Sequence, residues 1–224
     1  MDQNSSWKEA IRRVVPPAVL YERGVILRLG NTAGRLYVQM RFFDWLGFRR
    51  VNAATASSSA RNIVFVCFGN IMRSPMAEAL FHDATGPTRL TGLQISSAGL
   101  HAIPGKAAHP WALAAAEELG VSLANHRAKL ITTDVVKSAD AIFTMDFQNK
   151  AEMITRFPTA KHKIVMLSSY AEGPERYREI FDPYFGDLDA TRRCFKVIRT
   201  CVLNLTSALS AHDRKQPLES GVPR

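Results

Sequence analysis

A cysteine and an arginine six positions apart, on a short loop between an apolar run and a helical pattern, constrain this chain most. The apolar run I-V-F-V at 63–66 is followed by C-F-G-N-I-M-R-S at 67–74 and then by P-M-A-E-A-L at 75–80. This order predicts a strand, a tight loop and a helix. Backbone N–H groups that curl inward at a helix N-terminus can bind a small anion, which Cys67 and Arg73 would both face. The sequence therefore predicts a phosphate-binding loop with a nucleophile inside it.

Two residues of this loop permit unusual backbone conformations. Gly69 has no side chain to oppose positive φ, and Asn70 is among the few other residues that tolerate it. The dipole of the following helix also favours the thiolate form of Cys67. A cysteine and an arginine six positions apart occur by chance in many proteins. A cysteine that ends a strand can equally belong to the core. The assignment therefore depends on the rest of the chain.

Strand and helix patterns alternate after this loop. Further strands are expected at 93–96, 141–144 and 164–167, and further helices near 111–119, 153–158 and 188–209. Such alternation predicts an α/β fold, a parallel sheet covered by helices on both faces. Ligands of these sheets bind at the carboxyl ends of the strands, where Cys67 lies. The topology therefore supports the loop assignment independently.

Cysteine content and hydropathy limit the class of protein. The three cysteines form no C-x-x-C pair, so we expect neither a disulfide framework nor a zinc site, and a reducing cytoplasm is the expected location. No uncharged apolar run approaches the roughly 20 residues that cross a bilayer. Asp2 and Glu9 stand where a signal peptide would carry positive charge. We therefore expect a globular cytoplasmic protein.

Positive charge is concentrated near the start of the chain. The net charge is +9, and residues 1–60 hold nine Lys/Arg against four Asp/Glu, which is +5 and leaves +4 for the rest. Such a charge favours anionic partners, whether phosphorylated protein, lipid head groups or nucleic acid, and it does not choose among them. No motif indicates a specific nucleic-acid partner.

The composition divides the chain into four parts. We expect a basic amphipathic helical extension at 1–50, a linker of sequence V-N-A-A-T-A-S-S-S-A at 51–60, the catalytic domain at 61–212 and a polar tail at 213–224. Every candidate catalytic residue lies after Arg61. We therefore expect residues 1–60 to be dispensable for chemistry but not for placement of the protein.

The extension permits three interpretations. Apolar residues recur at helical spacing in 6–15, 18–29 and 36–46, and Pro16-Pro17 ends the first of these helices. The helices can fold back onto the catalytic domain or one another. They can also lie on an anionic membrane surface, at the inner face of a membrane, because Trp and Phe alternate with arginine. A cleaved organelle-targeting peptide is the third interpretation.

The complete loop string resembles that of the low-molecular-weight protein tyrosine phosphatase family, whose loop reads C-x-G-N-I-C-R-S-P. Other stretches resemble the family in the same order: S-A-G at 97–99, the segment 120–128, A-D-A-I-F-T-M-D at 139–146 and D-P-Y at 182–184. The resemblance covers about residues 62–209. It implies a four-stranded parallel sheet of the flavodoxin or Rossmann type, with helices on both faces. It also implies a phosphotyrosine phosphatase that requires no cofactor and no metal.

The resemblance implies a cysteinyl-phosphate mechanism. Cys67 would be the nucleophile, Arg73 the phosphate clamp and Asp182 the general acid and base, at the end of a lid that begins near Ser168. The implied substrate-binding residues are Phe68, Gly69, Asn70, Ile71, Met72, Ser74 and Tyr184, and the implied supporting residues are Ser97, His126 and Asp146.

Four of these residues have specific implied contacts. Ser74 matches a serine whose hydroxyl bonds the thiolate, although it can also cap the helix before Pro75. Ser97 and His126 match residues that brace the loop asparagine. Asp146 matches a carboxylate that would pair with the arginine and fix its plane.

Two departures from the family pattern are informative. Met72 replaces a cysteine that can form a disulfide with the nucleophile, so we expect the activity without that redox protection. The segment His101-Ala102-Ile103 lacks the large aromatic residue of many eukaryotic relatives, as in the bacterial members that act in exopolysaccharide control. The implied substrate is a phosphotyrosine-containing protein, such as a tyrosine kinase of polysaccharide export.

Three other functions stay open at this point. A thioredoxin-coupled arsenate reductase would need two further cysteines on a mobile segment, whereas Cys194 and Cys201 share one face of the last helix. A protein-arginine phosphatase usually has threonine in place of Ile71. A non-catalytic phosphate-binding adaptor would not need Cys67, Arg73 and Asp182 together.

Overall fold

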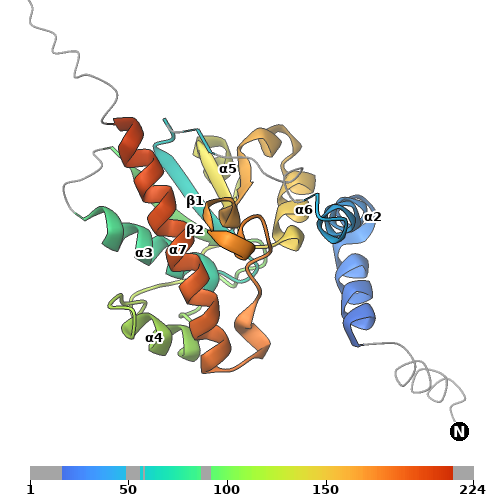
Figure 1. Cartoon of the computed structure of the whole chain (residues 1–224), viewed down its shortest axis with the longest axis horizontal. Coiled ribbons are helices and arrows are strands. Elements are labelled where there is room, and N and C mark those ends of the chain that lie inside the picture. Colours follow the sequence, from blue (N-terminus) through green and yellow to red (C-terminus); the bar gives the residue numbers. More distant parts are fainter. Residues whose placement is uncertain (1–16, 49–55, 58, 87–91, 214–224) are drawn as a thin grey trace, which may run out of the picture.

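The computed structural model describes residues 17–48, 56–57, 59–86 and 92–213 (Figure 1). The helix expected at 6–15 and residues 214–224 of the expected polar tail lie outside the described residues. Among the described residues, no helix combines the length and the apolar character needed to span a membrane.

Four parallel strands form one sheet. They are β1 (Asn62–Cys67), β2 (Gln94–Gly99), β3 (Ala141–Thr144) and β4 (Ile164–Met166), in the spatial order β2-β1-β3-β4. This arrangement confirms the predicted four-stranded parallel sheet. Cys67 ends the central strand β1, where it is paired in register with Gly99.

Helices cover both faces of the sheet, as predicted (Figure 1). On one face lie α3 (Arg73–Thr85), α4 (Pro110–Glu117) and α7 (Leu188–Asp213). On the other lie α6 (Phe147–Arg156) and α5 (Thr133–Ser138), a short helix that the sequence pattern did not predict. The described residues also contain four 3-10 helices: η2 (Pro158–Lys163), η3 (Leu167–Tyr170), η4 (Gly173–Glu175) and η5 (Pro183–Phe185).

Alternation along β1 explains the two layers. Ile63 and Phe65 point into the core under α3 and α7, whereas Val64 and Val66 point into the core under α6. All four side chains are at most 1% exposed. A central parallel strand is buried on both faces, which is why this strand reads as an uninterrupted apolar run.

The described part of the N-terminal extension forms a long helix, α2 (Pro17–Trp45), which packs on the outside of α6 (Figure 1). Val25, Tyr37 and Met40 of α2 are buried against Phe147 and Ala151 of α6. Of the three interpretations of the extension, this packing supports the one in which it folds back onto the catalytic domain. Leu36 and Met40 of the predicted apolar stripe face this contact, whereas Leu46 lies past the helix end and is exposed.

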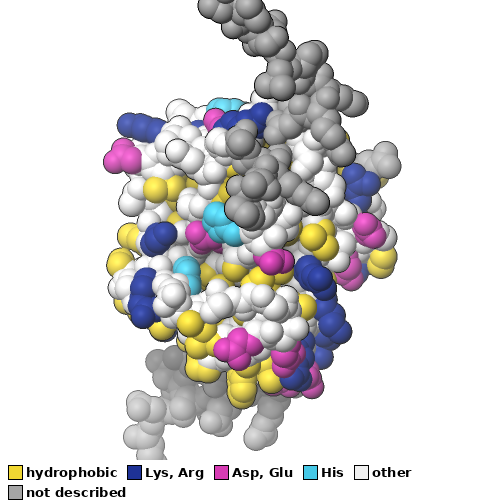
Figure 2. All heavy atoms as spheres, turned by 90° about the vertical axis from the view of Figure 1, so that its left-hand side faces the viewer, with side chains coloured by type: hydrophobic (Ala, Val, Ile, Leu, Met, Phe, Trp, Pro, Cys, Tyr) yellow, Lys and Arg dark blue, Asp and Glu magenta, His cyan; other side chains and the backbone are white. Residues whose placement is uncertain are grey.

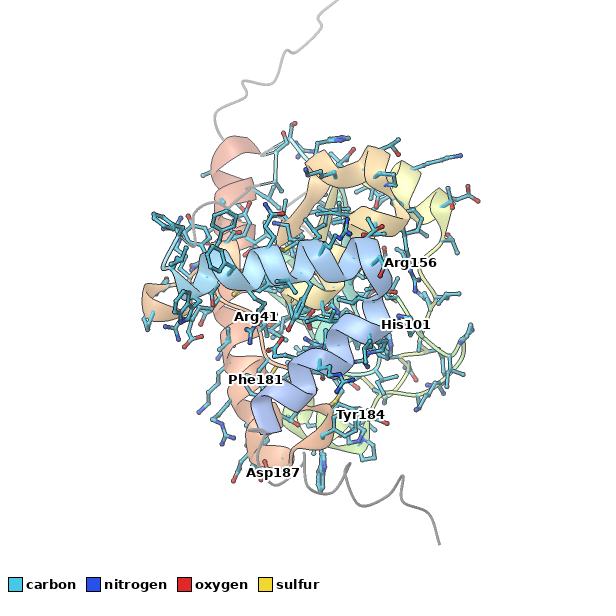
Figure 3. The ribbon with its side chains drawn as sticks, turned by 90° about the vertical axis from the view of Figure 1, so that its right-hand side faces the viewer. Arg41, His101, Arg156, Phe181, Tyr184 and Asp187 are labelled. Carbon is cyan, nitrogen blue, oxygen red and sulfur yellow. The ribbon has the colours of Figure 1, made fainter. Side chains whose placement is uncertain are left out.

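A sharp bend divides α2 into two halves at Gly30, which has φ 72° and ψ −172°. Figure 3 shows the second half lying across the domain, while the first half turns away obliquely toward the region of Phe181 and Tyr184. These dihedral angles belong to a region that glycine occupies and other residues avoid. The bend therefore requires a glycine.

The opposite side of the molecule carries mixed charges. On the face away from α2, basic and acidic side chains are interspersed (Figure 2).

The last residues of the predicted linker at 51–60 are packed, although a linker is expected to be exposed. Ala60 is 1% exposed, and Ala56 packs against the core. This part of the chain therefore lies against the catalytic domain.

Gly30→Ala should lower the free energy of unfolding by about 1–3 kcal/mol, because alanine is strained at this positive φ. Gly24→Ala is the matched control, since Gly24 lies in the same helix with nothing within 4 Å of an added Cβ. That change should be neutral or stabilise by about 0.5–1 kcal/mol. Denaturant unfolding followed by circular dichroism measures both. Equal effects of the two substitutions would contradict the assigned bend.

Candidate active site

The loop between β1 and α3 is held by the side chain of Asn70. Its Nδ2 donates to Ser74 Oγ at 2.9 Å and to Ser97 Oγ at 2.8 Å, and its Oδ1 accepts from Lys129 N at 2.8 Å. His126 Nε2 lies 2.7 Å from the backbone oxygen of Asn70. Asn70 is fully buried and has φ 52°. Its amide therefore replaces the backbone bonds that a regular structure would supply.

Of the two loop residues that permit positive φ, only Asn70 adopts it. Asn70 takes the left-handed conformation, whereas the φ of Gly69 is not positive. The close approach occurs instead at Gly99, where an added Cβ would lie 2.8 Å from both Asn70 N and Phe68 O. A glycine at the end of β2 thus lets the phosphate-binding loop pack directly on the neighbouring strand.

The Cys67 thiol lies at the bottom of this loop. Its Sγ accepts from Asn70 N at 3.2 Å and lies 3.0 Å from Ser74 Oγ. The sulfur therefore has two polar groups of the loop within hydrogen-bonding distance. Capping by Ser74 is wrong: α3 begins at Arg73, so its N-cap position is Met72, and Met72 makes no side-chain cap.

Arg73 is the most buried charged group of the site, with 1% of its surface exposed. One guanidinium nitrogen donates to Asp146 Oδ2 at 2.6 Å and to the Ile180 backbone oxygen at 3.0 Å. The other donates to Asp182 Oδ2 at 2.5 Å. Burial alone would lower the pKa of Arg73, but Asp182 and Asp146 outweigh it and raise the pKa above its ordinary value. The cation is therefore permanent and its plane is fixed from two sides.

Asp182 lies at the rim of the site, within a segment that we call the acid loop (residues 167–187, between β4 and α7). Its second oxygen accepts from Tyr184 N at 3.2 Å, and its side chain is 38% exposed. The structure therefore brings Cys67, Arg73 and Asp182 together from two distant parts of the chain. A partly exposed carboxyl can reach an oxygen that leaves the bound phosphoryl group.

These residues surround a cavity of about 740 Å³. Its rim carries the aromatic side chains of Phe68, Tyr184 and Phe185, together with His101, which stacks on Phe68 at 4.4 Å. Tyr184 packs edge-on against Phe185 at 4.9 Å. An aromatic ring of a substrate would find aromatic partners at this entrance.

The extension supplies part of the cavity wall, which the sequence did not predict. Glu22, Arg28, Tyr37 and Arg41 of α2 all line it. Arg28 lies over the Phe68 ring, 5.6 Å from its centroid. No sequence signal relates these helical residues to Cys67. The expectation that residues 1–60 are dispensable for chemistry therefore conflicts with the position of α2.

Glu179 of the acid loop also lines the cavity, and the sequence did not predict this role either. Burial, together with the nearby charge of Asp146, raises the pKa of Glu179 to about 7, against the pull of its hydrogen bond from Phe147 N and the charge of Arg41. A carboxyl group in such a position needs a cation beside it to stay ionised at neutral pH.

The two remaining cysteines are part of the core. Cys194 and Cys201 on α7 have no exposed surface, and burial raises the pKa of the Cys201 thiol to about 12 and that of Cys194 above its ordinary range. This environment disfavours the thiolate form that a disulfide exchange needs.

Comparison with known proteins agrees with this geometry. The family model described as "Low molecular weight phosphotyrosine protein phosphatase" matches residues 62–215. A probable low molecular weight protein-tyrosine-phosphatase, EpsP of Ralstonia nicotianae, is 34% identical over 139 residues, which are 62% of this chain and 89% of that protein. A protein-arginine-phosphatase of Bacillus subtilis is 35% identical over 128 residues, which are 57% of this chain and 83% of that protein.

A solved structure shows the same fold. The crystal structure of the Erwinia amylovora tyrosine phosphatase AmsI superposes with a TM-score of 0.62 at 31% identity, and covers 71% of this chain and 99% of that chain. The matched domain of this chain, which begins at residue 62, does not include α2. By the loop, the sheet and these matches, the chain belongs to the low molecular weight phosphotyrosine protein phosphatase family.

Proposed function

We propose that this protein hydrolyses phosphotyrosine in protein substrates through a cysteinyl-phosphate intermediate. The observation that carries the proposal is the position of the Cys67 thiol, 3.2 Å from Asn70 N and at the bottom of a cavity that Arg73 and Asp182 also line. A nucleophile, a fixed cation and a carboxyl group then face one bound phosphoryl group.

The first step is displacement at phosphorus. The Cys67 thiolate attacks in line, while Arg73 and the loop N–H groups hold the three equatorial oxygens. The bond from phosphorus to the tyrosine oxygen breaks, and Asp182 donates its proton to that oxygen. Asp182 is paired with Arg73 at rest, so before this step it leaves that ion pair and binds a proton from solvent. The Arg73 nitrogen that it releases then donates to the phosphoryl group.

The second step regenerates the enzyme. Asp182, now ionised, takes a proton from water, which attacks phosphorus and displaces the Cys67 thiolate as inorganic phosphate forms. Ser74 Oγ, 3.0 Å from Sγ, stabilises the departing thiolate. No step in this sequence requires a metal ion.

A protein-arginine phosphatase is the second candidate, because one of the relatives carries that name at 35% identity. Ile71 at the loop favours the tyrosine phosphatase, since the resemblance places threonine there in arginine phosphatases. Comparison of a phosphotyrosine peptide with a phosphoarginine peptide of the same sequence distinguishes the two, and we expect faster release of phosphate from the first.

We also propose that the protein is cytoplasmic and that the extension contacts an anionic membrane surface. Phe42, Trp45 and Phe48 are more than half exposed on the outer side of this segment, and Arg23 and Arg35 are exposed nearby along α2. Apolar and basic side chains of this kind suit the membrane interface. Loss of binding to anionic vesicles as salt is added would support the contact, and no binding at low salt would exclude it.

Cys67→Ser should abolish hydrolysis of an aryl phosphate, and Arg73→Lys should lower kcat/KM by about 100-fold or more, because an ammonium cannot replace the two-pronged guanidinium contact. Steady-state turnover of p-nitrophenyl phosphate, with and without a chelator, measures both. A Cys67→Ser preparation free of wild-type enzyme that retains the wild-type rate would refute the mechanism.

Asp182→Asn should slow phenyl phosphate far more than p-nitrophenyl phosphate, because a nitrophenoxide departs without a proton whereas a phenoxide needs one. The loss should be about 100-fold or more for the poor leaving group. The ratio of kcat/KM values for the two esters is the measurement. If both esters lose the same factor, Asp182 is not the general acid.

A further inference from the structure

Arg41 of α2 binds the extension to the acid loop. One guanidinium nitrogen of Arg41 lies 2.6 Å from Glu179 Oε2 in the acid loop, and the other lies 2.5 Å from Glu22 Oε1 in the first half of α2. We call these two ion pairs the Arg41 bridge. Figure 3 shows Arg41 on the second half of α2, on the side of the molecule that also carries Phe181 and Tyr184.

The Arg41 bridge is held on both sides. Glu22 also accepts from the Tyr37 hydroxyl at 2.6 Å, so both carboxylate oxygens of Glu22 are bonded. Tyr37 is 3% exposed and packs in the core between α2 and α6. Arg41 therefore projects from a firmly packed part of the helix. Its side chain is 40% exposed, and the two carboxylates of Glu22 and Glu179 fix its guanidinium group.

Hydrogen bonds connect Glu179 and its neighbour Ile180 to the elements that carry the proposed catalytic groups. Its Oε1 accepts from Phe147 N at 2.9 Å, directly after Asp146. The next residue, Ile180, donates its N–H to Met145 O at 2.8 Å and accepts from Arg73 at 3.0 Å. Asp182 follows two positions later.

Four residues of the acid loop thus run from the Arg41 bridge to the general acid. Both ends of this segment meet charged groups, Arg41 at Glu179 and Arg73 at Asp182. A displacement of Glu179 would reach Asp182 through a very short stretch of backbone. Because proton donation depends on position within a few tenths of an ångström, such a displacement costs rate.

We propose that Arg41 is a positioning residue for the general acid, which acts through Glu179 to hold Asp182 in place. The inference deepens the proposed function and depends on it. The matched family domain begins at residue 62, so this support comes from a part of the chain that lies outside that domain. The extension would then be a component of the active site.

Arg41→Met tests the proposal, because it removes the charge and keeps an unbranched side chain. It should lower kcat/KM for phenyl phosphate by about 10- to 100-fold and that for p-nitrophenyl phosphate by less than about threefold. Arg41→Lys should restore part of the loss. Arg35→Met is the matched control, because Arg35 is exposed on the same helix and lines an outer groove away from the catalytic cavity. It should leave both rates unchanged.

A double-mutant cycle checks that Arg41 acts through Glu179. In a Glu179→Gln background, Arg41→Met should cause less than about a threefold further loss with phenyl phosphate, because the bridge is already broken. If Arg41→Met does not fold, Glu179→Gln alone should still show the selective loss with the poor leaving group.

Several outcomes would overturn the inference. Equal losses with both esters would indicate a purely structural role of Arg41, and fully additive losses in the cycle would exclude action through Glu179. Unchanged rates in Arg41→Met, with an active wild-type protein, would refute this inference and leave the proposed function intact. A wild-type protein that hydrolyses neither ester would refute the proposed function and this inference with it.

Discussion

The active site depends on one buried cation. Arg73 has almost no exposed surface, and it joins α3, the N-terminus of α6 and the acid loop through Asp146, Ile180 and Asp182. A buried charge is tolerated only when it is paired and hydrogen-bonded, so each partner stabilises the others. In the proposed mechanism, the phosphoryl group of the substrate takes the place of Asp182 on Arg73, and Asp182 then lies beside the leaving oxygen.

The loop around the thiol is also stabilised by one buried side chain with several partners, that of Asn70. Asn70 carries its left-handed backbone conformation at a modest cost, because its side-chain amide bonds Ser74, Ser97 and Lys129. Ser97 in turn donates to a carboxylate oxygen of Glu78 on α3. The hydrogen-bond network holds the loop around the thiol, and the N–H of Asn70 donates to Cys67 Sγ at 3.2 Å. Such preorganisation is what allows backbone dipoles to stabilise a transition state without rearrangement.

Much of this site could be predicted from the sequence because its parts are local or belong to a short motif. Cys67 and Arg73 lie on one loop, and the apolar runs around them define the parallel sheet. Glu179 and Arg41 could not be predicted, since they are 138 positions apart and each reads as an ordinary charged residue. The bend at Gly30 could not be predicted either, because Gly24 lies in the same helical pattern and keeps the helical conformation. Tertiary packing determines long-range ion pairs and unusual backbone dihedral angles. The periodicity of apolar residues in a sequence carries no information about either.

The position of Gly30 in α2 restricts the insertions and deletions that the extension can accept. A straight helix of 29 residues would be about 43 Å long and would extend past the domain, so only the bend brings its first half to the cavity. Each residue of a helix turns by about 100°, and the bend is seven residues before Tyr37, which anchors the second half on α6. Insertion or deletion of one residue between them would rotate the first half about the helix axis and move Glu22 and Arg28 off the cavity wall. The spacing from residue 30 to residue 37 is therefore under the same geometric restriction as the catalytic loop, although it contains no reacting group.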